Sequence, residues 1–440
     1  MNKDRKIAVI GAGMAGLSAA YRLQQNGFST TLFEENHVVG GRTITAEKDG
    51  YTMDLGAITL SPAYKETIQL IEETGAGDAC VPFQPVLAIA REGKLHNIDL
   101  SSPAVSGIKS GFLSFWGKIK LLKLVPTLVK YWSKCDFEDM SKLEELDVES
   151  CESFALRKLG QEINDYLVDP IIRLNMFTLP SLSSVVDIVW LMKMFSGTQL
   201  IQLRGGMGAA SKSIAAQLED VQLNTRVTAV EERDGRVALE VDGTTRYFDG
   251  AVIALAPDAA LGVAPWLSGQ QRTWFEKIKA VPSLTIHIGL KSPPDTPASL
   301  VMVPSTEANE VIAIVLESNK CPARVPDGKG LISLHMTGQW AETQQGLTDL
   351  QVALNALGVI SPFMGDLEDQ VDMVHLHEWT HVDHERPVGF YKSLRNARPE
   401  FTRGRVMFAG TYISAGIEGA VISGKRCAEA LSMELKKTDR

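Results

Sequence analysis

The chain of 440 residues is longer than one hydrophobic core usually organises, so we expect two closely packed domains. Its 45% hydrophobic and 22% charged residues are typical of a globular protein. A formal net charge of −9 argues against nucleic acid as the main partner, because phosphate binding relies on clustered Lys and Arg.

The first residues and the cysteines indicate the cellular compartment of the protein. The first five residues lead directly into an apolar run, without the hydrophobic core of a signal peptide, which predicts a cytoplasmic protein. The five cysteines lie far apart and form no C-x-x-C pair. This spacing favours neither a disulfide framework nor a zinc or redox motif, and we expect no metal site.

A glycine motif follows the first predicted strand. Residues 6–10 form the continuous apolar run of a strand buried on both faces, and Gly11, Gly13 and Gly16 then give the spacing G-x-G-x-x-G. The first glycine allows a tight turn, the second lets backbone approach a pyrophosphate, and the third allows close packing of helix and strand. The amide groups at the start of the following helix can bind the phosphates.

An acidic residue completes the pattern. A second strand is expected at residues 30–33, and Glu34 follows it about 20 residues after the glycines, where a carboxylate can accept hydrogen bonds from ribose hydroxyls. Another glycine turn leads to Gly41 and Arg42, whose permanent charge can return to the phosphates. An ordinary βα corner with a surface arginine is the alternative. Strand, helix and acid together favour nucleotide binding.

These motifs, with the following segment 51–57, resemble the FAD-binding start of the flavin amine oxidase superfamily, which includes monoamine and polyamine oxidases, protoporphyrinogen oxidases and carotenoid desaturases. The resemblance implies an α/β fold, with a Rossmann-like FAD-binding domain of the GR2 type and an inserted α+β substrate domain. It implies a discontinuous FAD-binding domain, made of residues 1–85, 199–282 and 396–440. The substrate domain, a helical insertion plus a sheet, is made of residues 86–198 and 283–395.

Residues 107–132 are apolar but carry five lysines, which disqualifies them as a membrane-spanning helix. Two interpretations stay open. The segment is either an amphipathic helix that covers the substrate cavity, with solvated lysines, or a helix that lies on a membrane surface. In the second case Trp116 and Trp132 would be amphipathic anchors, and the lysines would meet anionic head groups.

The middle of the chain alternates between helices and strands. A helix is expected at 64–75 and a hairpin at 86–98, and residues 136–198 look helical, with 147–184 most similar to the protoporphyrinogen oxidase branch. Short strands are expected within 221–254, substrate-sheet strands within 284–334, and one helix at 341–358. A buried strand at 405–411 and a closing helix at 417–435 return to the first domain.

The resemblance implies which residues hold the cofactor. They come from the glycine motif, from the segment beside the flavin, from a strand whose valine backbone holds the adenine, and from the C-terminal turn and helix. The set is Gly11, Gly13, Ala15, Gly16, Glu34, Glu35, Gly41, Arg42, Gly56, Ala57, Val227, Gly410, Thr411, Ile417 and Glu418. The Glu418 side chain either contacts FAD or caps the helix. No cysteine lies between 408 and 418, so we expect non-covalent FAD.

Residues 379–391 combine aromatic and ionisable groups and match a region that lines the substrate side of the flavin in relatives. His381, His384 and Tyr391 are the catalytic candidates, the histidines as proton acceptors. A histidine of a polar loop is more often solvated, and the aromatic residues serve a core equally well. The cofactor supplies the electronics, so a strong general base is optional.

One departure concerns a lysine that monoamine oxidases carry in the first strand of the substrate sheet, where Thr285 stands here. We therefore expect an FAD-dependent oxidoreductase that removes a hydride from a C–N or activated C–C bond of a largely apolar small molecule. The absence of a second dinucleotide motif favours oxygen or a quinone as electron acceptor. The alternatives are a redox-neutral isomerase or cyclase, and a non-catalytic FAD-binding scaffold. Oligomeric state and substrate identity are not predicted.

Overall fold

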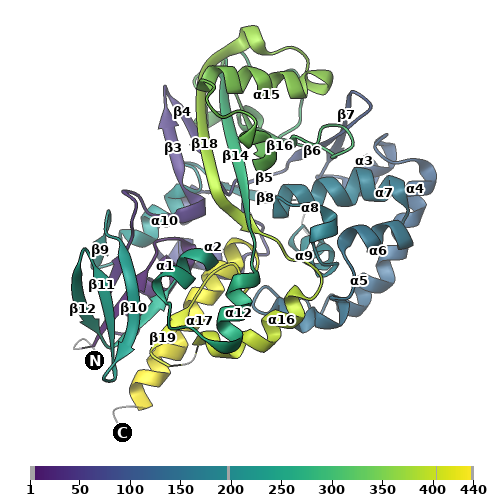
Figure 1. Ribbon diagram of the computed structural model, residues 1–440. Coiled ribbons are helices and arrows are strands. Elements are labelled where there is room, and N and C mark those ends of the chain that lie inside the picture. Colours follow the sequence, from purple (N-terminus) through teal and green to yellow (C-terminus); the bar gives the residue numbers. More distant parts are fainter. Residues whose placement is uncertain (1–4, 196–198, 403, 438–440) are drawn as a thin grey trace.

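The structure is a computed structural model that describes residues 5–195, 199–402 and 404–437. Figure 1 shows one part, built partly from the first and last segments of the chain, at the lower left, a sheet at the top, and a group of helices at the right. The chain passes between these parts several times, so the first two are each assembled from segments far apart in sequence.

The first part contains a five-stranded parallel sheet. Its strands are β1 (Lys6–Ile10), β2 (Ser29–Phe33), β9 (Asp220–Gln222), β13 (Gly250–Ile253) and β19 (Val406–Phe408). Their order in the sheet is β19-β13-β1-β2-β9. Ile7, Ala8 and Val9 of the central strand are fully buried, which explains the uninterrupted apolar sequence of β1. The strands predicted at 6–10 and 30–33 are confirmed.

One face of this sheet is covered by helices from both ends of the chain. The helices of this part are α1 (Met14–Gln25), α2 (Lys65–Glu73), α10 (Gly208–Ala215) and α17 (Gly416–Lys437). A Cβ atom on Gly424 would lie 2.1 Å from the carbonyl oxygen of Ala15, so only glycine lets α17 approach α1 this closely. Ser18 Oγ donates to the Val421 carbonyl oxygen at 2.8 Å. The C-terminal helix is therefore fixed against the glycine motif.

The other face packs on a small antiparallel sheet and short helices. These are β10 (Val227–Arg233), β11 (Arg236–Val241), β12 (Thr244–Phe248), α11 (Pro257–Val263) and α12 (Gly269–Lys277). The rings of Phe33 and Phe248 meet edge to face, 5.9 Å apart. Two short strand pairs join the parts, namely β3 (Thr45–Lys48) with β4 (Tyr51–Asp54) and β5 (Cys80–Phe83) with β8 (Leu200–Leu203).

The second sheet has seven strands. They are β6 (Val86–Arg91), β7 (Lys94–Asp99), β14 (Ala280–Leu290), β15 (Leu300–Met302), β16 (Val311–Leu316), β17 (Gly330–Thr337) and β18 (Val371–His384), in the order β18-β14-β17-β16-β15-β6-β7. The β6–β7 hairpin is as predicted. Helix α15 (Asp349–Met364) packs Val352, Ala356 and Ile360 against one face of the sheet. The side chain of Thr285 lies on the other face. That other face points toward the first part of the molecule.

The remaining helices form the group beside the two sheets. They are α3 (Pro103–Lys109), α4 (Phe115–Lys120), α5 (Val125–Tyr131), α6 (Cys151–Lys158), α7 (Gln161–Ile163), α8 (Asp169–Met176) and α9 (Val186–Met194). Two short helices, α13 (Glu317–Lys320) and α14 (Gly338–Glu342), follow β16 and β17, and α16 (Phe390–Ala397) follows β18. None of the helices described here combines the length and hydrophobicity needed to cross a bilayer.

Two predictions about local structure were wrong. Residues 341–358 do not form one helix, because α14 ends at Glu342 and α15 begins after Thr348, whose side chain and Gln351 form a capping box. The histidines of 379–391 do not lie in a polar loop. His381 and His384 belong to the long strand β18, which pairs with β14 over almost its whole length.

Candidate functional site

A cavity of about 850 Å³ lies between the parallel sheet and the seven-stranded sheet. Its lining includes Gly11 and Gly13 at one end and His335 and Phe177 at the other. Gly416, at the start of α17, lines the same cavity. The two ends of the chain therefore meet at one site, in the crevice at the carboxyl ends of the parallel strands where α/β sheets bind ligands.

The glycine motif forms one end of this cavity. Gly11 has φ +98°, and a Cβ atom on Gly16 would lie 1.9 Å from the Gly11 carbonyl oxygen. A Cβ atom on Gly13 would meet no atom within 4 Å, so this glycine borders open space. Helix α1 begins after Gly13 without a side-chain cap, which leaves the amide groups of its first turn free for an anion. Ala15 also lines the cavity.

The two acidic residues after β2 have different surroundings. Glu34 is buried and lines the cavity, and its carboxylate accepts hydrogen bonds from the amide of Ala12 at 2.8 Å and from the side-chain amide of Asn36 at 2.7 Å. Glu35 is exposed, lies 3.6 Å from Arg226, and is not among the lining residues. Only Glu34 is placed to bind a ligand in the cavity.

Arg42 links three distant segments at the cavity wall. Its guanidinium donates to the Val382 carbonyl oxygen at 3.1 Å and to Thr411 Oγ1 at 2.8 Å. Burial lowers the pKa of Arg42, while the nearby Asp383 raises it. Gly41 precedes it with φ +53° and leaves only 3.2 Å between an added Cβ atom and the Gly13 Cα atom. The second glycine turn thus packs directly on the first.

The segment after β4 follows the cavity closely. A Cβ atom on Gly56 would lie 2.3 Å from the Arg42 carbonyl oxygen, and the Ala57 amide donates to that same oxygen at 2.9 Å. Both residues line the cavity. Val227 lies in β10, its side chain is buried in the core, and it is not a lining residue.

Three C-terminal residues, Gly410, Thr411 and Ile417, line the cavity, but Glu418 does not. The Glu418 carboxylate accepts hydrogen bonds from the amides of Glu66 and Thr67, both at 2.9 Å, and from Thr67 Oγ1 at 2.7 Å. It therefore caps the N-terminus of α2. Of the two roles considered for this side chain, the geometry supports the helix cap, at a helix other than its own.

The three catalytic candidates also differ in whether they line the cavity. His381 lines the cavity, and its Nδ1 atom lies 3.5 Å from Asp258 Oδ1. Burial and Arg42 lower the pKa of His381. His384 and Tyr391 are fully or almost fully buried and are not lining residues. Of the three candidates, the structure brings only His381 to the cavity.

His384 and Tyr391 belong to a buried polar cluster behind the cavity wall. His384 Nδ1 lies 3.2 Å from Asp383 Oδ1, and burial lowers the pKa of His384 to about 4. Arg386 donates to both oxygens of Asp383, with a shortest distance of 2.9 Å. The Tyr391 hydroxyl donates to Asp187 at 2.5 Å, and burial raises the pKa of Asp187 to about 7. This cluster fixes the end of β18, which holds Arg42 through Val382.

The far end of the cavity is largely apolar. Its walls come from α8, α9 and the second sheet, and they include Leu87, Ile171, Leu174, Phe177, Leu191, Phe195, Met302, Ile312 and Val315. Trp379 and Tyr412 also line the cavity, whereas Phe390 packs on Trp274 in the core. An apolar ligand fits such walls better than a charged one.

Three polar residues of this end were missed by the sequence analysis. Lys320 is buried, lines the cavity, and donates to the Ile58 carbonyl oxygen at 3.1 Å while pairing with Glu317 at 2.8 Å. His335 and His377 line the cavity on the two strands that flank β14. They stand opposite Thr285 in the strand register, so they lie in one row across the sheet.

The surroundings of His335 in this row favour its neutral form. Thr285 Oγ1 lies 3.3 Å from His335 Nδ1 and 3.4 Å from the Leu55 carbonyl oxygen. Burial, together with the charge of Lys320, lowers the pKa of His335 to about 4. His335 is therefore neutral at neutral pH and is a weak base. No local sequence signal indicated this row, because its members meet only through strand pairing.

Within the described residues, no group of three or more His, Cys, Asp and Glu side chains could hold a metal ion. None of residues 107–132 lines the cavity, so that segment is not its cover.

The parallel sheet with its glycine motif and the second sheet across the cavity define a Rossmann-like FAD-binding fold with a substrate domain. The model of the family of flavin-containing amine oxidoreductases matches residues 14–432, and the chain belongs to that family.

The chain is 35% identical over 170 residues to mitochondrial protoporphyrinogen oxidase of Nicotiana tabacum, which covers 38% of this chain and 32% of that protein. It is 28% identical over 285 residues to 4,4'-diapophytoene desaturase (4,4'-diaponeurosporene-forming) of Staphylococcus aureus strain MRSA252. This match covers 56% of this chain and 54% of that protein. The matched regions thus span about a third to a half of these relatives.

Among solved structures, cyclohexylamine oxidase from Brevibacterium oxydans IH-35A matches with a TM-score of 0.78 at 18% identity, covering 98% of this chain and 99% of that one. At this identity the likeness shows the fold alone.

Proposed function

We propose that the chain binds FAD non-covalently in the cavity and removes a hydride from a C–N or activated C–C bond of a largely apolar small molecule. The observation that carries this proposal is the single cavity that joins the glycine motif to apolar walls. A cofactor held at one end of such a cavity would present its reactive ring to a substrate held at the other end.

The residues at the nucleotide end fit the cofactor. Gly13 borders open space beside the start of α1, where a pyrophosphate would meet free amide groups. Glu34 is buried in the lining and offers a carboxylate to ribose hydroxyls. Arg42 and Thr411 would stand farther along the cofactor, and the positive end of α17 at Ile417 would favour negative charge on the bound ring. When bound, FAD supplies the acceptor for the electron pair.

The chain's own side chains would orient the substrate, exclude water and manage protons. Trp379 and Tyr412 line the cavity and would limit the space around a bound ring, and the apolar walls would hold the rest of the substrate. His381 and His335 have lowered pKa values, so each is neutral near pH 7. With a pKa of about 4, His335 is the weaker base, so His381 is the proposed proton acceptor. Lys320 lines the cavity and pairs with Glu317 at 2.8 Å, so its amino group is held in place at the wall.

The relatives support the proposed bond types. Their names include a protoporphyrinogen oxidase and a diapophytoene desaturase, and the fold neighbours include cyclohexylamine oxidase. Oxygen or a quinone is the proposed electron acceptor, because the sequence has no second dinucleotide motif. The lack of a cysteine between 408 and 418 supports non-covalent binding.

The test is anaerobic titration of the flavin-loaded protein with amines, porphyrinogens and polyenes. We expect one class to bleach the flavin spectrum, and air to restore it. Flavin that stays oxidised with every class would contradict the proposal. Product formed without oxygen consumption, measured with an oxygen electrode and without added quinone, would instead favour the redox-neutral alternative. Acid precipitation should release the flavin into the supernatant.

A further inference from the structure

We propose that the outer face of residues 105–132 docks on the surface of an anionic lipid bilayer and that the cavity receives its apolar substrate from that side. This docking face goes beyond the chemistry proposed above. It consists of α3, α4, the turn η3 (Leu121–Leu124) and α5.

The docking face exposes an unusual amount of apolar side chain. The relative exposure of Ile108, Phe115, Trp116, Leu122 and Val129 lies between 68% and 74%. Val105, Ile119, Val125 and Trp132 are also exposed. Soluble surfaces carry single exposed apolar residues, whereas a contiguous group marks an interaction site.

These residues follow the helical repeat. From α4 through η3 to α5 the backbone stays helical, and exposed apolar side chains recur every three or four residues at Phe115, Ile119, Leu122, Val125 and Val129. The opposite side of this stretch is also apolar and packs inward through Gly117, Leu124 and Tyr131. The outer stripe therefore has no role in holding the helix to the protein.

The charge of the docking face indicates which kind of partner it binds. Residues 100–135 contain no Asp or Glu, in a chain whose net charge is −9. Lys109, Lys120, Lys123 and Lys130 are exposed along the stripe, whereas Lys134 beyond its end pairs with Glu145 at 3.1 Å. Two copies of this face would bring lysines against lysines in a twofold dimer, which disfavours self-association. Apolar side chains flanked by lysines match an anionic bilayer surface.

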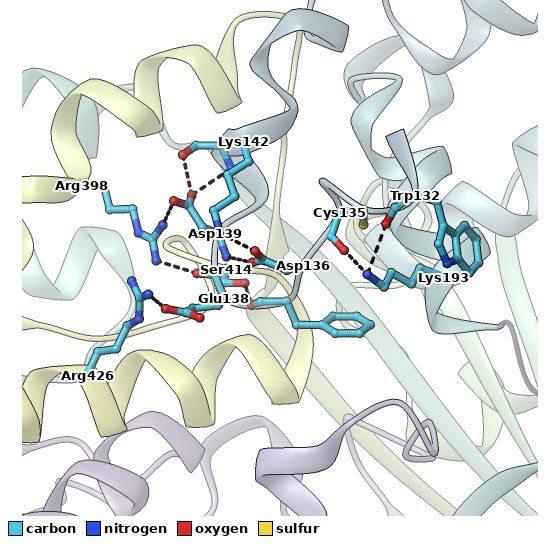
Figure 2. Close-up of polar contacts among 12 residues, drawn as sticks. Trp132, Cys135, Asp136, Glu138, Asp139, Lys142, Lys193, Arg398, Ser414 and Arg426 are labelled. Atoms are coloured by element: carbon cyan, nitrogen blue, oxygen red, sulfur yellow. Dashed lines mark hydrogen bonds and ion pairs between the residues drawn. The ribbon is translucent and has the colours of Figure 1, made fainter. Parts of the chain in front are cut away.

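The docking face is firmly attached to the rest of the molecule. Figure 2 shows Lys193 of α9 reaching the carbonyl oxygens of Trp132 and Cys135, and the acids that follow pairing with arginines near the C-terminus. Glu138 pairs with Arg426 of α17, and Asp139 pairs with Arg398. A surface held in this way can set the orientation of the whole protein on a membrane.

The docking face also lies near the cavity. Met192 lines the cavity and is 40% exposed, and its neighbour Lys193 makes the contact with Trp132. The cavity wall at Met192 therefore lies beside the C-terminal end of the docking face. Apolar molecules dissolved in the bilayer would reach the apolar walls without crossing water.

The experiment measures binding of the full-length, flavin-loaded protein to vesicles by sedimentation. We expect binding to vesicles of phosphatidylcholine mixed with phosphatidylglycerol, and at least tenfold weaker binding to phosphatidylcholine alone. The combined change of Lys120, Lys123 and Lys130 to Gln should weaken binding roughly 100-fold at low salt. The combined change Trp116→Ser, Leu122→Ser and Val129→Ser should reduce it at least tenfold.

The matched control changes two apolar residues that are exposed elsewhere, Trp266→Ser and Met433→Ser, and it should bind as the wild type does. Thermal unfolding of every variant checks that it is folded. Failure of the wild type to bind either vesicle would overturn the proposal. Equal loss in the control, or a wild-type dimer that dissociates when the three apolar residues are changed, would also overturn it. Vesicle binding needs no substrate, so the result does not depend on the proposed chemistry.

Discussion

The two ends of the cavity are encoded differently. At the nucleotide end, Gly11, Gly13, Gly16 and Glu34 lie within one short stretch of sequence and take their places through a single βαβ unit. At the substrate end, Lys320 comes from the short helix α13, His335 from β17 and His377 from β18. A motif with fixed local spacing is readable in sequence, whereas a site built by strand pairing is not. The two ends should also respond differently to mutation.

The largest effect is expected at the tightest glycine. Gly16→Val would force a side chain against the Gly11 carbonyl oxygen, 1.9 Å from the new Cβ atom, and should destabilise the protein by about 3 kcal/mol with loss of bound flavin. Gly13→Ala is the control for volume, since its Cβ atom meets no protein atom within 4 Å. It should fold normally and lose only flavin affinity. Thermal unfolding and flavin content measure both outcomes, and a stable, flavin-loaded Gly16→Val variant would contradict this account.

Variants of two nearby histidines compare a residue that lines the cavity with a residue buried in the core. His381→Gln should slow substrate-dependent flavin reduction about 100-fold, because it removes a proton acceptor from the lining. His384→Gln leaves the lining unchanged and should alter thermal stability more than the rate. Stopped-flow absorbance under nitrogen gives the rates. Equal rate losses in both variants would show that the burial of His384 does not exclude it from catalysis.

Two neighbouring acids offer a similar comparison at the other end. Glu34→Ala should weaken FAD binding about 20-fold, which is the scale of one hydrogen-bonding charged group. Glu35→Ala removes an exposed carboxylate outside the cavity and should leave the dissociation constant unchanged. Fluorescence titration of the apoprotein measures both constants. Similar losses would mean that the adenosine part lies outside the predicted position.

The smallest effect concerns the buried cluster behind the wall. The pKa of Asp187 is raised to about 7, so its protonated form stabilises the folded state below pH 4, and this contribution is lost as pH rises through 7. Asp187→Asn keeps an acceptor for Tyr391 and removes the titration. The melting temperature of the wild type should therefore fall by roughly 2 °C more than that of the variant between pH 5 and pH 8. A constant difference across this range would contradict the raised pKa.

The sequence allowed the fold and most of the nucleotide end to be predicted, because glycine turns and buried strands have local signatures. It did not reveal why Glu418 is buried, since its partners in α2 lie about 350 residues earlier in the chain. The strand of Thr285 has no lysine, and the sequence did not show that Lys320 reaches the cavity from α13. In both cases the contact exists only after distant segments pack together.

The most direct test of the central claim is the flavin content of the purified protein. The account predicts a yellow protein that carries about one FAD per chain, released on denaturation, and whose apoprotein takes FAD up again. A colourless, folded protein that takes up no added FAD would contradict it, whatever substrates were later found.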